Sequence, residues 1–139
     1  MDVTREAMVR ESFARQGLMG TIGAEISSIT SGQLEIHFGF KPTLTQQHGF
    51  VHAGVVASVM DSACGYAAMS VAPENYEVLT VEFKVNLLAP ALGKSFVVRS
   101  MVKRAGKTLT ICAADAFAVS DAGEKMIATM LATMINRAQ

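Results

Sequence analysis

Residues 48–70 read HGFVHAGVVASVMDSACGYAAMS, and this stretch organises the rest of the chain. Asp61 is the only formally charged residue between Lys41 and Glu74, and its neighbours are mostly Gly, Ala, Ser, Val and Met. A buried carboxylate without a partner is energetically costly. Asp61 is therefore predicted to lie at a cleft, to be satisfied by hydrogen bonds, or to have a chemical role.

The same stretch predicts a long helix from about residue 53 to residue 70, ending before Pro73. At 100° per residue, the bulkier side chains gather on one arc: Val55, Val56, Val59, Met60, Ala63, Tyr66 and Ala67. Asp61 lies at the centre of the opposite arc, among small residues that let a ligand or another backbone approach its carboxylate. A helix that is apolar on nearly all sides is buried in the protein. The central Asp argues against a membrane span, because it costs about 3 kcal/mol on insertion scales.

Length and composition predict one domain, residues 1–139, with a substantial core. The chain has 12 basic and 12 acidic residues spread along its length, which argues against a nucleic-acid-binding surface. Cys64 and Cys112 have no metal-ligand spacing, and the first dozen residues do not resemble a signal peptide. We therefore expect a cytoplasmic protein without a metal site.

The remainder of the chain predicts a short helix over residues 2–16, stopped at Gly17, and a series of strands. The expected strands cover residues 20–29, 33–40, 79–87, 96–103, 108–119 and 126–135. Ser31-Gly32 is a hairpin signal between the first two, and residues 41–50 are expected to form a loop. The last strand is apolar or Thr on both faces, which predicts a cover for each face. Together these elements indicate an α+β fold in which an antiparallel sheet of five to six strands wraps around the central helix.

The entrance to that helix, His52-Ala53-Gly54, can bind an oxygen that carries negative charge. The first turn of a helix presents unpaired N–H groups and the positive end of the dipole. Asp61 lies about 12 Å further along by helical rise, too far for one substrate carbonyl to touch both places. If the two places cooperate, each site of a symmetric dimer takes its N–H donors from one chain and its carboxylate from the other.

The pattern Gly49-x-x-His52-Ala53-Gly54-x6-Asp61-x3-Gly65 resembles the hotdog-fold thioesterases of the phenylacetic-acid-degradation (PaaI-like) type, whose signature reads G-x-x-H-G-G-x6-D. The likeness extends through the Leu-Ala-Pro break at residues 88–90 and the R-x-G-K turn at residues 104–107. It therefore covers nearly the whole chain. The family is a better guide to fold and reaction than to substrate.

The resemblance implies roles for five residues. Asp61 matches the catalytic carboxylate, which acts as a general base on water or as a nucleophile on the thioester carbon. Ala53 and Gly54 match the glycine pair whose N–H groups polarise the thioester carbonyl, although the first glycine is replaced by Ala here. Gln46 stands where many members have an Asn that touches the carbonyl or the water. Thr80, on the polar side of its strand, matches a Ser or Thr that holds the water in some members.

The resemblance also implies that the substrate is an acyl or aryl-acyl thioester of coenzyme A, which enters as part of the substrate and not as a separate cofactor. Gly49 and His52 are expected to line the substrate site, with His52 as a structural residue. Coenzyme A phosphates need cations. Arg99, Lys103, Arg104 and Lys107 are expected to cluster at one turn, where Gly106 permits a close approach, although a solvated strand edge explains any one of these charges equally well.

The sequence therefore predicts an acyl-CoA thioesterase that forms at least a homodimer with shared active sites, with a tetramer left open. One alternative is a hotdog enoyl thioester hydratase or dehydratase, which would require His48 or His52 as a base. Another is a non-catalytic module that binds acyl thioesters. Chain length of the acyl group, and the choice between base and nucleophile for Asp61, stay open at this point.

Overall fold

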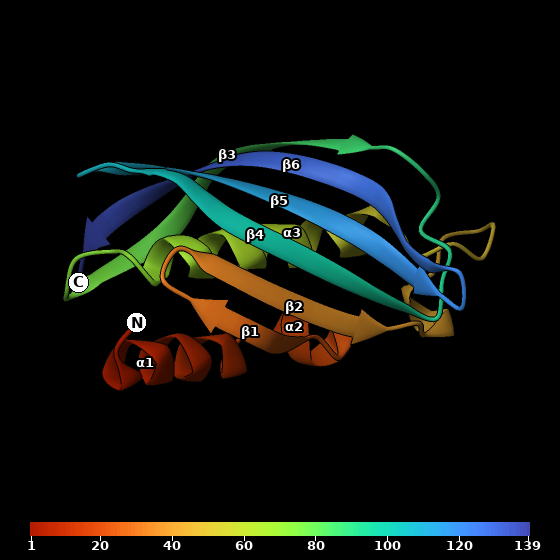
Figure 1. Ribbon diagram of the computed structural model, residues 1–139, viewed down its shortest axis with the longest axis horizontal. Coiled ribbons are helices and arrows are strands. Elements are labelled where there is room, and N and C mark those ends of the chain that lie inside the picture. Colours follow the sequence, from red (N-terminus) through yellow and green to blue (C-terminus); the bar gives the residue numbers. More distant parts are fainter.

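The computed structural model describes residues 1–139 and contains three α-helices, one short 3-10 helix and six strands. In chain order the elements are α1 (Val3–Ala14), α2 (Gly17–Ile22), β1 (Glu25–Thr30), β2 (Gln33–Gly39), η1 (Pro42–Leu44), α3 (Ala53–Met69), β3 (Tyr76–Leu87), β4 (Ser95–Ala105), β5 (Leu109–Ser120) and β6 (Gly123–Ala138). The strands form one antiparallel sheet in the order β1-β2-β4-β5-β6-β3. Figure 1 shows this sheet curving over α3, while α1 lies outside the wrapped core.

Helix α3 is the centre of the hydrophobic core, as its sequence predicts. Val59, Met60 and Ala63 on its bulky arc are completely buried. The helical projection places Cys64 on the same arc as Asp61, but Cys64 is completely buried too, so the accessible face of the helix is narrower than expected. Asp61 is half-buried on what remains of that face. The helix therefore fills the concave side of the sheet and leaves the carboxylate at an opening.

The N-terminal segment differs from the prediction. The first helix ends at Ala14 and a second helix, α2, occupies the start of the segment that was expected to be a strand. Gly17 does not act as a stop, because α1 ends at its C-cap residue Arg15 and Gly17 is the first residue of α2, after the extended residue Gln16. Gly23 terminates α2 in the left-handed conformation (φ 80°), a conformation that glycine adopts without strain. The expected hairpin at Ser31-Gly32 is confirmed, with β1 paired to β2.

Strand β3 contains a bulge that the alternation in its sequence does not reveal. Thr80 pairs with Met134 of β6, whereas Glu82 pairs with Thr133, so Val81 is the extra residue. The bulge reverses which side chains face α3. Thr80 consequently faces the helix, so the prediction that it lies on the polar side of the strand is wrong.

The convex face of the sheet has no cover within the chain. The even-numbered residues of β6 from 128 to 136 are buried against α3, but Leu131 on the other face is 51% exposed. Met101 on β4 and Leu109 on β5 are also exposed. The prediction of a cover on each face of β6 is therefore met by α3 on one side only.

Candidate active site

The first turn of α3 is capped by a side chain. His52 is the N-cap residue, and its Nδ1 accepts the N–H of Gly54 at 2.7 Å. A Cβ on residue 54 would lie 3.0 Å from that Nδ1, so glycine is what lets the imidazole approach. The N–H of Ala53 has no partner within the chain. The first turn of α3 therefore leaves the N–H of Ala53 free, whereas the N–H of Gly54 is occupied by the imidazole of His52.

The loop before the helix fixes the orientation of Gln46. Its Oε1 accepts the N–H groups of His48 (2.6 Å) and Phe50 (3.3 Å), and its backbone N–H donates to the carbonyl oxygen of Phe50 at 2.8 Å. Two N–H donors at one amide atom identify that atom as the oxygen. Gly49 adopts φ 83°, which lets the chain turn back between these groups. The amide nitrogen of Gln46 is consequently left to donate elsewhere.

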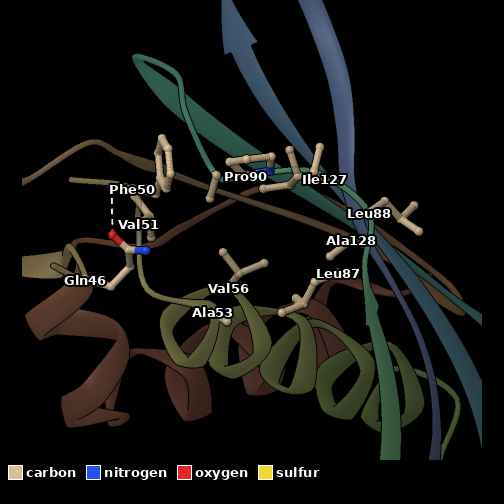
Figure 2. A pocket seen from close by; sticks show the side chains of 12 residues that line it. Gln46, Phe50, Val51, Ala53, Val56, Leu87, Leu88, Pro90, Ile127 and Ala128 are labelled. Atoms are coloured by element: carbon tan, nitrogen blue, oxygen red, sulfur yellow. Dashed lines mark hydrogen bonds between the residues drawn. The ribbon is translucent and has the colours of Figure 1, made fainter. Parts of the chain in front are cut away.

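Gln46 and Ala53 line the same cavity, which has a volume of about 420 Å³. Its other walls are apolar and come from the loop, the start of α3, the segment after β3, and β6: Phe50, Val51, Val56, Leu87, Leu88, Ala89, Pro90, Ala91, Ile127 and Ala128. In Figure 2, Ala53 and Val56 form the floor of this cavity at the start of α3, and Gln46 stands at one side with its carbonyl bonded back to the loop. The cavity thus combines an apolar slot with two hydrogen-bond donors.

Asp61 lies in a different cavity. The hydroxyl of Thr80 donates to its Oδ1 at 2.7 Å, which is the contact that the bulge in β3 makes possible. No lysine or arginine pairs with Asp61. The carboxylate therefore keeps Oδ2 free to accept another proton or hydrogen bond.

This second cavity has a volume of about 390 Å³ and a mainly polar lining. It is formed by the end of α1, the middle of α3 and the start of β3, together with the last residues of the chain: Ser12, Arg15, Gln16, Asp61, Ser62, Gly65, Tyr66, Met69, Glu77, Val78, Thr80, Met134 and Gln139. The N-terminal segment contributes three of these side chains, Ser12 from α1 and Arg15 and Gln16 from the turn between α1 and α2. Sequence reasoning missed this contribution, because α1 carries no motif and Tyr66 was predicted only as core.

The predicted site residues thus fall into two groups within one chain. The first group lies at the start of α3 and in the loop before it: Gln46, His52, Ala53 and Gly54. In the second group, Asp61 lies two turns further along α3 and Thr80 reaches it from β3. The two cavities have no lining residue in common. One chain alone does not bring the donors and the carboxylate to one point.

The basic turn between β4 and β5 is built differently from the expectation. Gly106 is required by the turn itself, since a Cβ there would lie 2.3 Å from the carbonyl oxygen of Leu109. Asn136 of β6 donates to the carbonyl oxygens of Gly106 and Lys107, at 3.2 and 3.3 Å. The side chains of Arg104 and Lys107 form no ion pair. They are therefore free to meet an anion.

Arg99 does not belong to this turn. Its guanidinium donates to Glu35 (2.9 Å) and to both carboxylate oxygens of Glu124 (2.7 and 2.8 Å). It also lies 5.0 Å above the ring of Phe117. The two carboxylates hold the pKa of the guanidinium above its ordinary value. Arg99 therefore pairs with Glu35 and Glu124 on the convex face of the sheet and does not belong to the predicted phosphate-binding cluster.

The two cysteines are buried thiols. Burial raises the pKa of Cys112 to about 11. Burial raises the pKa of Cys64 further, with smaller contributions from the nearby Cys112 and from Asp61. Because the thiolate is the reactive form, neither cysteine is a nucleophile at neutral pH.

No cluster of three or more His, Cys, Asp or Glu side chains with a metal-binding arrangement occurs, and no helix is long and apolar enough to cross a membrane.

The fold and the site define a hotdog-type α+β protein whose central helix carries both a free N–H at its start and a carboxylate at its middle. The chain belongs to the thioesterase superfamily, whose family model matches residues 48–124. That match contains the whole of α3 and the strands β3, β4 and β5. The predicted fold class and the predicted family are both confirmed.

Solved structures agree with this assignment. A thioesterase family protein from Silicibacter pomeroyi is 50% identical, with a TM-score of 0.95 over 97% of this chain and 99% of that one. The PaaI protein of the E. coli phenylacetic acid degradation operon is 16% identical and shares the fold, with a TM-score of 0.84 over 97% of this chain and 94% of its own.

A Saccharolobus solfataricus protein named provisionally as an esterase is similar in sequence, with 29% identity over 91% of this chain and 82% of its own length.

Proposed function

We propose that the protein hydrolyses acyl-CoA thioesters at active sites shared between two copies of the chain. The observation that carries this proposal is the division of the site. Ala53 offers an unpaired N–H in one cavity, and Asp61 offers a carboxylate in another, on the same helix. A two-fold axis can bring the first cavity of one copy against the second cavity of its partner.

Strand β3 is the edge on which such a pair would form. It is 12 residues long, pairs with β6 on one side only, and exposes apolar side chains. Val81 is 54% exposed, Phe83 42% and Leu87 58%. A long apolar edge strand is a template for pairing with another strand. Antiparallel pairing of two β3 strands would place the start of one, beside Thr80, next to the end of the other, beside Leu87.

The reaction needs a base, a water molecule and an oxyanion site. In the shared site Asp61 takes a proton from water through its free Oδ2, while Thr80 holds Oδ1 in place. The water oxygen attacks the thioester carbon, and the carbonyl oxygen becomes an oxyanion. The N–H of the partner's Ala53 and the amide of the partner's Gln46 stabilise that charge. The C–S bond then breaks, the acid is released, and the thiol leaves with a proton returned from Asp61.

The same groups explain why His52 is not assigned as the base of a hydratase or dehydratase. Its Nδ1 accepts the N–H of Gly54, so this nitrogen is occupied by the helix cap. Arg104 and Lys107, whose side chains form no ion pair, supply charge for the coenzyme A phosphates. The convex face of the sheet, where Met101, Leu109 and Leu131 are exposed and no part of the chain covers them, would allow two dimers to stack into a tetramer.

The test is release of thiol from a panel of aliphatic and aryl acyl-CoAs, measured with a thiol-trapping dye. Asp61→Asn is nearly isosteric, and it is expected to lower kcat by about 10²–10⁴-fold, the usual contribution of a general base. The circular dichroism spectrum and the oligomeric state should be unchanged. Hydrolysis at the wild-type rate in Asp61→Asn would overturn the assignment, and hydration of an enoyl-CoA without thiol release would favour the hydratase alternative.

A further inference from the structure

The polar cavity beside Asp61 is chemically unlike the cavity at the start of α3. Only four of its thirteen lining residues are hydrophobic, compared with ten of twelve in the other cavity. An alkyl chain bound there would remove water from polar groups and give them no partner. The lining therefore favours a group that forms hydrogen bonds.

Several polar groups of this cavity have N–H or O–H donors that no residue of the chain uses. The Oε1 of Gln16 already accepts the hydroxyl of Ser62 at 2.9 Å, so only the amide N–H groups of Gln16 remain. The hydroxyls of Ser12 and Tyr66 lie 3.1 Å apart and share one hydrogen bond, which leaves one O–H hydrogen unused. Arg15, at the end of α1, is exposed, and its guanidinium forms no ion pair.

The acidic groups near these donors do not satisfy them. Glu77 is paired with Arg137 of β6, at 3.2 Å. Asp61 is bonded to Thr80 and is needed for the reaction. Besides the free oxygen of Asp61, the cavity therefore offers the guanidinium of Arg15 and the amide N–H groups of its sequence neighbour Gln16, and the ligand that complements these donors is an oxygen acceptor. A carboxylate fits best, because a guanidinium can bind it through two parallel hydrogen bonds.

From this hydrogen-bond inventory we propose that the acyl group of the substrate ends in a carboxylate, which Arg15 and Gln16 bind in the polar cavity. This inference rests on the proposed thioesterase function and names its substrate class. The cavity lies in the same chain as Asp61, so a substrate whose carbonyl carbon meets that carboxylate can extend its acyl arm directly into it.

Coenzyme A itself does not fit the cavity electrostatically. Its several phosphate charges would meet one arginine together with the carboxylates of Asp61 and Glu77. A single terminal carboxylate brings one charge, which the single guanidinium can match. The coenzyme A side of the thioester is therefore assigned to the apolar cavity of the partner, and the acyl group is assigned to the polar cavity.

The experiment compares straight-chain acyl-CoAs with their ω-carboxy counterparts of equal length in the full-length protein. At the length that reaches Arg15, the ω-carboxy substrate is expected to have the higher kcat/KM. Arg15→Gln should lower that value by about tenfold or more, the usual loss of a charge-assisted hydrogen bond, and leave the methyl-terminated substrate within about twofold. Arg10→Gln is the matched control, because Arg10 also lies on α1 but pairs with Glu6 and does not line the cavity.

Equal kcat/KM for both substrate series, or an equal effect of Arg15→Gln on both, would overturn the inference and leave the thioesterase proposal standing. If no acyl-CoA releases thiol, the proposed function fails, and calorimetric binding to Asp61→Asn still decides the substrate class. Tighter binding of the ω-carboxy thioester that is lost in Arg15→Gln supports the inference. Equal binding of both thioesters refutes it.

Discussion

A heterodimer of two inactive variants would test whether each active site draws on both chains. The first variant is Asp61→Asn, which removes the base. The second is Ala53→Pro, which removes the one N–H at the start of α3 that has no partner in the chain. Residue 53 is the first position of the helix, where proline is well tolerated. His52 has φ −59° and ψ 137°, the extended conformation that a residue before proline adopts, so the fold should survive.

Each homodimer should be nearly inactive. Ala53→Pro removes one oxyanion donor, which typically costs about 10²–10³-fold in kcat, and Asp61→Asn removes the base. In the heterodimer one shared site contains both lesions and the other contains neither. Its activity should therefore return to about half that of the wild-type dimer, because one of two symmetric sites is intact.

The assay uses the two variants coexpressed with different affinity tags, and heterodimers are isolated by two successive purifications. Thiol release is then measured per dimer. A site contained within one chain predicts no recovery, because every chain of the heterodimer carries a lesion. A pure heterodimer without activity, from variants that melt at the wild-type temperature, would refute the shared site.

Three further outcomes follow from particular contacts. Thr80→Val should lower kcat/KM by about tenfold or more through loss of its hydrogen bond to the catalytic carboxylate, and should leave the melting temperature nearly unchanged. Gly106→Ala should destabilise the protein by about 1–3 kcal/mol in urea titrations, because its Cβ would lie 2.3 Å from a backbone oxygen, whereas Gly17→Ala, with nothing within 4 Å, should not. Burial raises the pKa values of Cys64 and Cys112 above their ordinary 9.0, so the unfolded chain loses these protons at a lower pH than the folded chain. The free energy of unfolding should therefore fall as the pH rises from 9 towards 11. In the variant that carries both Cys64→Ala and Cys112→Ala, the free energy of unfolding from urea titrations should fall less between pH 8 and pH 10.

Most of the fold was predictable because its signals are local. The helix over residues 53–69 follows from a long apolar stretch without breakers, and the strands follow from their alternation. The hairpin at Ser31-Gly32 follows from turn chemistry. The N-terminal error has the opposite cause: α2 has only six residues, too few for a period to be seen, and Gly23 rather than Gly17 ends the helical segment.

The sequence alone also indicated the centre of the candidate site, through the isolated carboxylate Asp61 on the helix that begins after His52, and the family resemblance added Gln46 and Thr80. Only the tertiary structure decided how those residues are used. The bulge at Val81 turns Thr80 toward the carboxylate, and the imidazole of His52 occupies the second N–H of the helix.

The structure likewise decided the surroundings of the site. Arg99 forms hydrogen bonds to two carboxylates that are 64 and 25 residues away in sequence. The polar cavity is assembled from α1, α3 and β3. Local periodicity carries information about which face a side chain occupies, but not about the partner it meets there. Those partners come from distant segments, and they determine which donors, acceptors and charges remain free for a substrate.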